Sequence, residues 1–94
     1  MSSVHYSLCS TAGLQATTDT PDAAASVLVR HLSEAACGGA VDWMISSPVG
    51  RVHHGRFKQP ADRSPSAAVA DHVDEVHGRL LRDAAQLMAA PQRV

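Results

Sequence analysis

The spacing of apolar residues changes between a strand-like and a helix-like repeat along this chain of 94 residues. Alternation with a period of two marks residues 4–10 and, weakly, 14–18, and a helical repeat then marks 21–37. A second alternating stretch covers 41–58, and a second helical stripe begins at Pro65. Short connections make neighbouring strands antiparallel. The order strand, strand, helix, strand, strand, helix predicts an α+β fold, a two-layer sandwich with both helices on one face of a small antiparallel sheet.

Both helices carry start signals and apolar stripes. Thr20 and Pro21 are typical of a helix N-terminus, and Gly38 with Gly39 is typical of a helix end. The expected first stripe is Ala24, Val27, Leu28, His31, Leu32 and Ala35. The second helix opens at Ser64–Pro65, and its expected stripe is Val69, Val73, Val76, Leu80 and Leu87. Gly78 stands inside that helix, where it either permits close packing or is merely tolerated.

The alternating stretches give the sheet one apolar face and one mixed face. Val41, Trp43 and Ile45 share a face, and turns are expected at residues 11–13 and 47–50. The opposite face holds His5, Ser7, Cys9, Asp42, Met44 and Ser46. The strand within 51–58 has little apolar alternation, with Val52 and His54 on one side and His53 and Phe57 on the other. We expect an edge strand or a strand that pairs across a dimer.

Large apolar side chains are scarce for a domain of this size. Alanine supplies 16 of the 42 hydrophobic residues, and only three residues are aromatic. A small domain buries a smaller fraction of its surface on folding than a large one does. Association of two subunits would bury more apolar surface and so add to stability. We expect one domain over 1–90, a frayed tail at 91–94, and a homodimer. The abundance of alanine and arginine is also typical of a GC-rich bacterial genome.

Other features narrow the class of protein. No apolar run approaches the length of a membrane span, and the first residues do not resemble a secretory signal. Cys9 and Cys37 could form at most one disulfide, so a cytoplasmic location is expected. Cys9 is expected in the strand core. Cys37 is expected at a helix C-terminus, which disfavours thiolate formation.

A basic segment follows an acidic first half. Arg51, Arg56 and Lys58 carry permanent charges and lie close to His53 and His54. Such a hairpin could contact phosphate groups, so nucleic acid or another anion is one possible partner. The overall pI of 6.6 argues against a broad nucleic-acid surface. The alternative is a solvated edge strand whose charges oppose aggregation.

The six histidines form no recognisable metal-binding pattern. His72 and His77 lie too far apart around a helix to share a metal, although each has a carboxylate three residues away, Glu75 and Asp74. His31 reads as a hydrogen-bonded core histidine. We therefore expect no metal, no cofactor and no catalytic residue, since Ser46 or Ser47 with Asp42 lacks a nucleophile elbow. Another hypothesis for the histidines is an interface that responds to pH, because histidine changes its charge near pH 6–7.

These observations favour a binding or interaction module that forms a homodimer through sheet edges or the mixed face. An alternative is a small enzyme or ligand-binding domain with a histidine-containing pocket at a subunit interface. A second alternative is anion binding by the 51–58 hairpin. The candidate interface or ligand residues are His5, Asp42, Trp43, His53, His54 and Phe57, and the candidate anion-binding residues are Arg51, Arg56 and Lys58.

Overall fold

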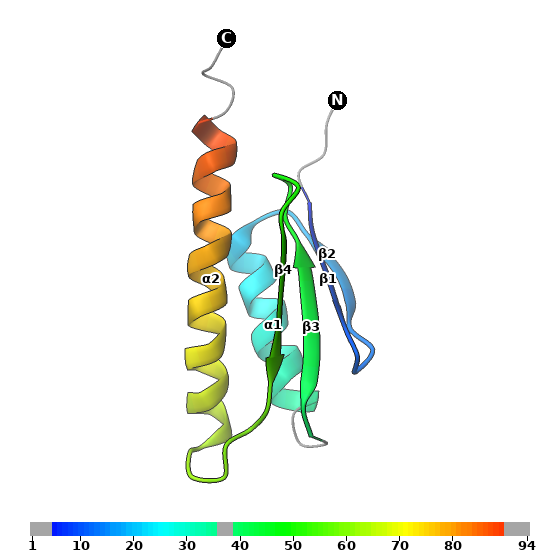
Figure 1. Ribbon diagram of the computed structural model, residues 1–94, viewed down its shortest axis with the longest axis vertical. Coiled ribbons are helices and arrows are strands. Elements are labelled where there is room, and N and C mark those ends of the chain that lie inside the picture. The colour runs from blue at the N-terminus through cyan, green and yellow to red at the C-terminus, as the bar shows by residue number, and fades with distance from the viewer. Residues whose placement is uncertain (1–4, 36–38, 90–94) are drawn as a thin grey trace.

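The computed structural model describes residues 5–35 and 39–89 and has the predicted order of elements (Figure 1). The fold is α+β, with a four-stranded antiparallel sheet and two helices, which confirms the predicted class. The predicted tail at 91–94 lies outside the described residues. The elements are β1 (Tyr6–Ser10), β2 (Gln15–Thr18), α1 (Pro21–Ala35), β3 (Val41–Ser46), β4 (Val52–Phe57) and α2 (Pro65–Ala89).

The strand order is β2-β1-β3-β4, so β1 and β3 are central and β4 is an edge strand. Each hairpin turns through three residues. The N–H of Gly13 bonds to the carbonyl of Ser10 (3.2 Å), and that of Gly50 bonds to the carbonyl of Ser47 (3.0 Å). Gly13 and Gly50 have φ values of 94° and 84°, the left-handed conformation that such loops need at their last residue. The two predicted turns are therefore confirmed.

The helices begin where the sequence predicts. Thr20 Oγ1 accepts the N–H of Ala23 (3.1 Å), and Ser64 Oγ accepts the N–H of Ala67 (3.3 Å). Each side chain thus caps the first turn of its helix. α1 ends at Ala35 in the described part of the chain, and the predicted end at residue 37 lies outside it. No helix among the described residues combines the length and apolar character that crossing a membrane requires.

The core lies between the helices and one face of the sheet. It contains all three aromatic side chains, and its members are Tyr6, Leu8, Ala24, Ala25, Leu28, Leu32, Val41, Trp43, Ile45, Phe57, Ala68, Val69, Val73, Val76 and Leu80. Alanines from α1 and α2 belong to it, and the two helices pack against each other. The scarcity of large side chains is thus met partly by placing every aromatic residue inside.

Two expectations about particular residues are wrong. Cys9 is exposed, because alternation in β1 turns it away from the helices. The i,i+4 spacing of Glu75, Arg79 and Asp83 predicts two ion pairs on the helix surface. Arg79 does pair with Glu75 (2.8 Å), but the side chain of Asp83 is buried and does not pair with Arg79. Gly78 does not permit close packing, because a Cβ there would meet nothing within 4 Å outside the helix's own backbone.

Candidate functional site

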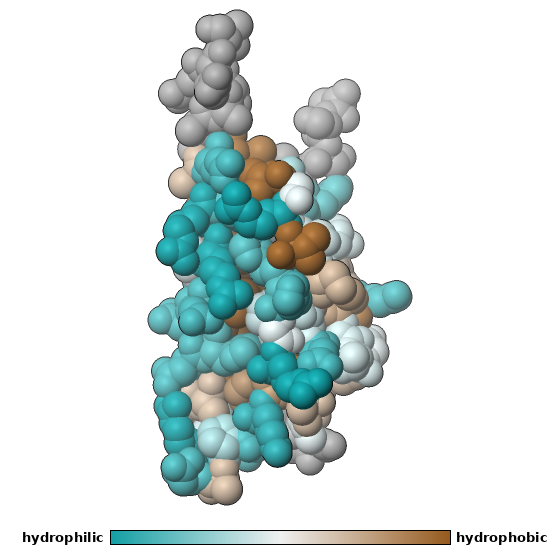
Figure 2. All heavy atoms as spheres, viewed as in Figure 1, coloured by the Kyte–Doolittle hydropathy of each residue, from teal (hydrophilic) through white to brown (hydrophobic). Residues whose placement is uncertain are grey.

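No helix of the described residues covers one face of the sheet, and we call it the open face (Figure 1). Strand alternation and register assign to it Ser7, Cys9, Gln15, Thr17, Asp42, Met44, Ser46, Val52, His54 and Arg56. Met44 and Val52 are 43% and 50% exposed, which is high for apolar side chains. Figure 2 shows apolar surface as islands over β3 and β4 between polar areas. A shallow hollow of about 640 Å³ lies along β1, β3 and β4 on this face.

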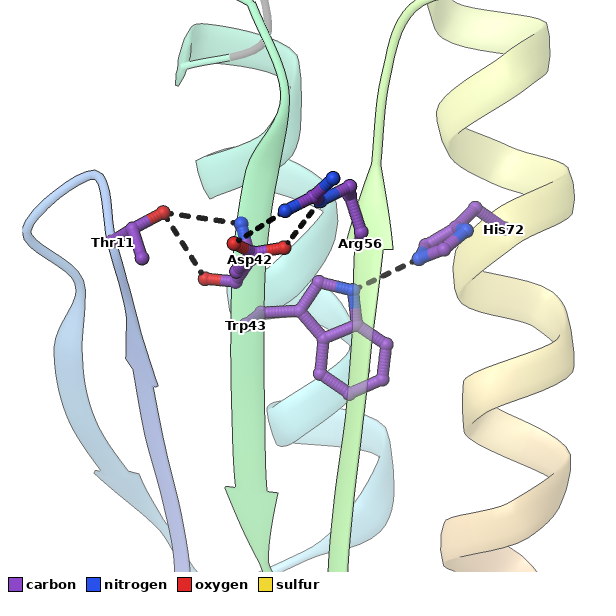
Figure 3. Close-up of polar contacts among 5 residues, drawn as sticks. All are labelled: Thr11, Asp42, Trp43, Arg56 and His72. Atoms are coloured by element: carbon purple, nitrogen blue, oxygen red, sulfur yellow. Dashed lines mark hydrogen bonds and ion pairs between the residues drawn. The ribbon is translucent and has the colours of Figure 1, made fainter.

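An ion pair crosses the open face between β3 and β4. Arg56 donates from Nε and Nη2 to the Asp42 carboxylate at 2.7 and 3.3 Å (Figure 3). Hydrogen bonding to Arg56 holds the pKa of Asp42 below its usual range, although a smaller desolvation effect opposes it. Thr11 fixes the same point of β3, because its Oγ1 accepts the backbone N–H of Asp42 (3.1 Å). The two charges therefore neutralise each other on this surface.

A second polar group lies on the helix side, where Asp83 of α2 is almost completely buried. His53 Nε2 donates to its Oδ2 at 2.6 Å, and Arg51 Nη1 donates to its Oδ1 at 3.0 Å. Burial raises the pKa of Asp83, but the hydrogen bond with His53, the nearby Ser47 hydroxyl and the charges of His53 and Arg51 outweigh it. The net pKa is lowered, so the carboxylate is ionised at neutral pH. We call Arg51, His53 and Asp83 the Asp83 clamp, because they tie β4 to α2.

Ser47 lies beside the Asp83 clamp but does not form a catalytic triad with it. It is buried, and its hydroxyl contributes to lowering the pKa of Asp83. No atom of the described residues lies in hydrogen-bonding geometry to that hydroxyl, so it does not bond to His53. Nucleophilic catalysis needs the serine and the histidine to share a hydrogen bond. The geometry therefore supports a structural role for the clamp.

A third polar contact joins the sheet to α2 through Trp43. The indole Nε1–H donates to His72 Nε2 at 2.9 Å, as Figure 3 shows. Because an indole only donates, His72 is neutral and carries its proton on Nδ1. Burial lowers the pKa of His72, the charge of Arg79 acts the same way, and Glu75 opposes them. Trp43 and Phe57 both meet the His72 ring edge-on, with centroids at 5.7 and 5.2 Å.

The predicted interface and ligand residues are divided between the two faces. Asp42 and His54 lie on the open face, and His5 is exposed just before β1. Trp43, His53 and Phe57 point toward the helices. The side chains of His5, Asp42, Trp43 and His53 therefore do not line one common pocket in the described structure.

The predicted anion-binding residues are largely occupied by carboxylates. Arg51 bonds to Asp83 and Arg56 bonds to Asp42. Lys58 is exposed and has no ion pair within the described ranges. An anion would have to compete with both carboxylates for the two arginines, so the hairpin offers less free positive charge than its sequence indicates.

His31 and His77 each hydrogen-bond to a side chain of another element. His31 pairs with Ser10 Oγ at 2.6 Å, as expected for a bonded histidine against the core. His77 bonds to Asp22 of α1 at 2.7 Å rather than to Asp74. No group of three or more possible metal ligands occurs within residues 5–35 and 39–89.

Sequence reasoning missed Asp83 and the role of His72. Asp83 continues the stripe of Val69, Val73, Val76 and Leu80 at helical spacing. An acidic residue at a core position could have signalled a buried ion pair with the basic hairpin. His72 gave no comparable signal, because only the packing of Trp43 against β4 brings the two rings together.

Comparison with models of protein families, with curated proteins and with solved structures finds no match to this chain.

Proposed function

We propose that the chain is a small cytoplasmic interaction module that forms a homodimer through the open face of its sheet. The observation that carries this proposal is the position of Met44 and Val52. These apolar side chains are about half exposed on the sheet face that no helix covers. Exposed apolar surface that adjoins polar groups on a flat layer is typical of a protein-protein contact.

The charge of the open face favours a second copy as the partner. Asp42 and Arg56 already neutralise each other, and the other members of the face carry no permanent charge. A two-fold interface brings the same patch together twice, so a patch with net charge would repel itself. The open face avoids this repulsion, because its permanent charges, Asp42 and Arg56, pair with each other.

Disrupting the open face tests the proposal. Replacing Met44 with Glu places a charge in the centre of the face, where burial without a partner is costly. We expect Met44→Glu to shift the protein from dimer to monomer in light scattering at micromolar concentration. The matched control is Leu81→Glu, because Leu81 is 46% exposed on α2 rather than on the sheet.

Two outcomes would contradict the proposal. One is a wild-type protein that remains monomeric at these concentrations. The other is a dimer that Leu81→Glu dissociates while Met44→Glu leaves it intact, since the interface would then lie on the helices. Circular dichroism of both variants verifies that the fold is retained.

A further inference from the structure

The outer edge of β4 carries backbone groups that have no partner among the described residues, and the register identifies them. The N–H of Ser47 bonds to the carbonyl of Arg51 (2.8 Å), which makes these two residues a hydrogen-bonded pair. In an antiparallel ladder such pairs recur at every second residue. The backbone groups of His53, Gly55 and Phe57 therefore face β3. Those of Val52, His54 and Arg56 point away from the sheet.

This edge lacks three of the devices that prevent strand pairing. Natural edge strands are protected by proline, bulges or charged side chains that stand over the edge. The register of β4 with β3 runs without a bulge over all six residues of β4, which contain no proline. Arg56 is held across the sheet by Asp42, and His53 is held inward by Asp83. α2 lies on the outer side of β4 (Figure 1), but the outward backbone groups of Val52, His54 and Arg56 have no hydrogen-bond partner among the described residues.

A groove lies between the Arg56 end of this edge and α2. α2 lies beside β4 on its outer side in both ribbon views (Figures 1 and 3). A hollow of about 350 Å³ is lined from the strand side by Arg56, Phe57 and Lys58 and from α2 by Ala68, Asp71, His72 and Glu75. A groove between an edge strand and a helix is the geometry in which peptides add to a sheet as an extra strand.

The uncompensated charge along the groove is positive. Asp71 is paired with Arg63, and Glu75 is paired with Arg79. Lys58 follows β4 at one end and has no carboxylate partner in the described part of the chain. Arg82 lies two helical turns beyond Glu75, on the same side of α2, and is likewise without an ion pair among the described residues.

We propose that the groove between β4 and α2 binds an extended acidic peptide segment, which adds to β4 as a fifth strand. Backbone hydrogen bonds to Val52, His54 and Arg56 hold the segment, and Lys58 and Arg82 select its acidic side chains. The site uses the outward backbone groups of β4, whereas the proposed dimer uses side chains of the open face, so peptide binding does not rest on the proposed dimer.

A single segment fits this position better than the β4 strand of a second copy. Neighbouring strands lie about 4.8 Å apart, so a segment needs only the width of one strand beside β4. A second copy would bring its own α2 along the outer side of its own β4. The two helix layers would then have to occupy the same space beneath the joined edges.

Peptide binding is measured with fluorescein-labelled octapeptides that alternate threonine and valine and end in two glutamates or in two lysines. Fluorescence anisotropy should show binding of the glutamate peptide and weaker binding of the lysine peptide. His54→Pro removes an outward N–H that β3 does not use, so the fold should persist while affinity falls about tenfold. His54→Ala keeps that N–H and should bind as the wild type does.

Charge selection is tested with Lys58→Glu and Arg82→Glu, which should each weaken binding of the glutamate peptide. Arg30→Glu is the matched control, because Arg30 is an exposed cation on α1, and it should leave affinity unchanged. Amide hydrogen exchange gives a second readout that does not depend on variants. The peptide should protect the amides of Val52, His54 and Arg56.

The proposal is overturned if the glutamate peptide does not bind, or if it binds without protecting those three amides. It is equally overturned if His54→Pro folds and binds with unchanged affinity. Binding of single-stranded oligonucleotide that outcompetes the peptide and ignores His54→Pro would assign the cations to an anionic polymer instead. A change in oligomeric state on His54→Pro that His54→Ala does not cause would assign the edge to a second copy.

Discussion

Gly55 shows how one residue determines a contact between the two layers. Trp43 lies opposite it in the ladder, and a Cβ on Gly55 would stand 2.8 Å from Trp43 Cζ2. The indole can therefore lie across β4 and reach His72 only because this position is glycine. Gly78 is the opposite case, since a Cβ there would stand in open space.

The same substitution should therefore have opposite effects at the two glycines. Gly55→Ala should lower the free energy of unfolding by about 1–3 kcal/mol, as overpacked cores do. Gly78→Ala should raise it by up to about 1 kcal/mol, because alanine favours the helix. Urea denaturation of both variants measures these changes. Changes of the same sign in the free energy of unfolding would contradict a close contact at Gly55 and open space at Gly78.

Asp83 should be the most sensitive charged residue of the fold. Asp83→Ala leaves His53 without its carboxylate partner, and loss of one member of a buried pair costs about 3 kcal/mol. Arg79→Ala breaks only a surface pair and should cost less than about 0.5 kcal/mol. Thermal denaturation compares the two, and similar losses would mean that the Asp83 clamp contributes little.

At the scale of elements, the joint between β3 and α2 should respond to acid. The folded pKa of His72 is lowered by burial, so the fold favours its neutral form. The stabilisation is present above the unfolded pKa of about 6.5 and is lost as pH falls from there toward the folded pKa. Protonated Nε2 cannot accept the Trp43 N–H.

We therefore expect the free energy of unfolding to decrease between pH 7.5 and 5.5, and expect His72→Gln to show a smaller decrease. Asp83 adds a separate loss below about pH 4, because its folded pKa is lowered and its stabilisation needs the carboxylate. Urea denaturation followed by Trp43 fluorescence measures both ranges. An unchanged slope in His72→Gln between pH 7.5 and 5.5 would exclude this role.

The elements themselves were predictable because local signals agreed. Thr20 and Ser64 cap helices as their sequence positions predict, and Gly13 and Gly50 adopt the turn conformations expected of glycine. Polar contacts between elements were less predictable. His77 pairs with Asp22, 55 residues away in sequence, and no local pattern specifies such a partner.

At the scale of the whole molecule, the sequence predicted the sheet and its uncovered face but not the pairing of charges across it. From the sequence, the cations of the basic hairpin were predicted to be free to bind anions. In the fold, Arg51 and Arg56 are held by carboxylates from α2 and β3. Counting charges along the chain cannot reveal this, because each pair forms only when separate elements meet.

The accessibility of Cys9 tests the proposed dimer most directly, because its thiol is exposed on the open face. In a Cys37→Ser variant, which leaves Cys9 as the only thiol, the rate of reaction with a thiol reagent is measured across protein concentrations that span dimer formation. We predict that the rate falls as the dimer forms. A constant rate in a protein that sedimentation shows to dimerise would contradict the account.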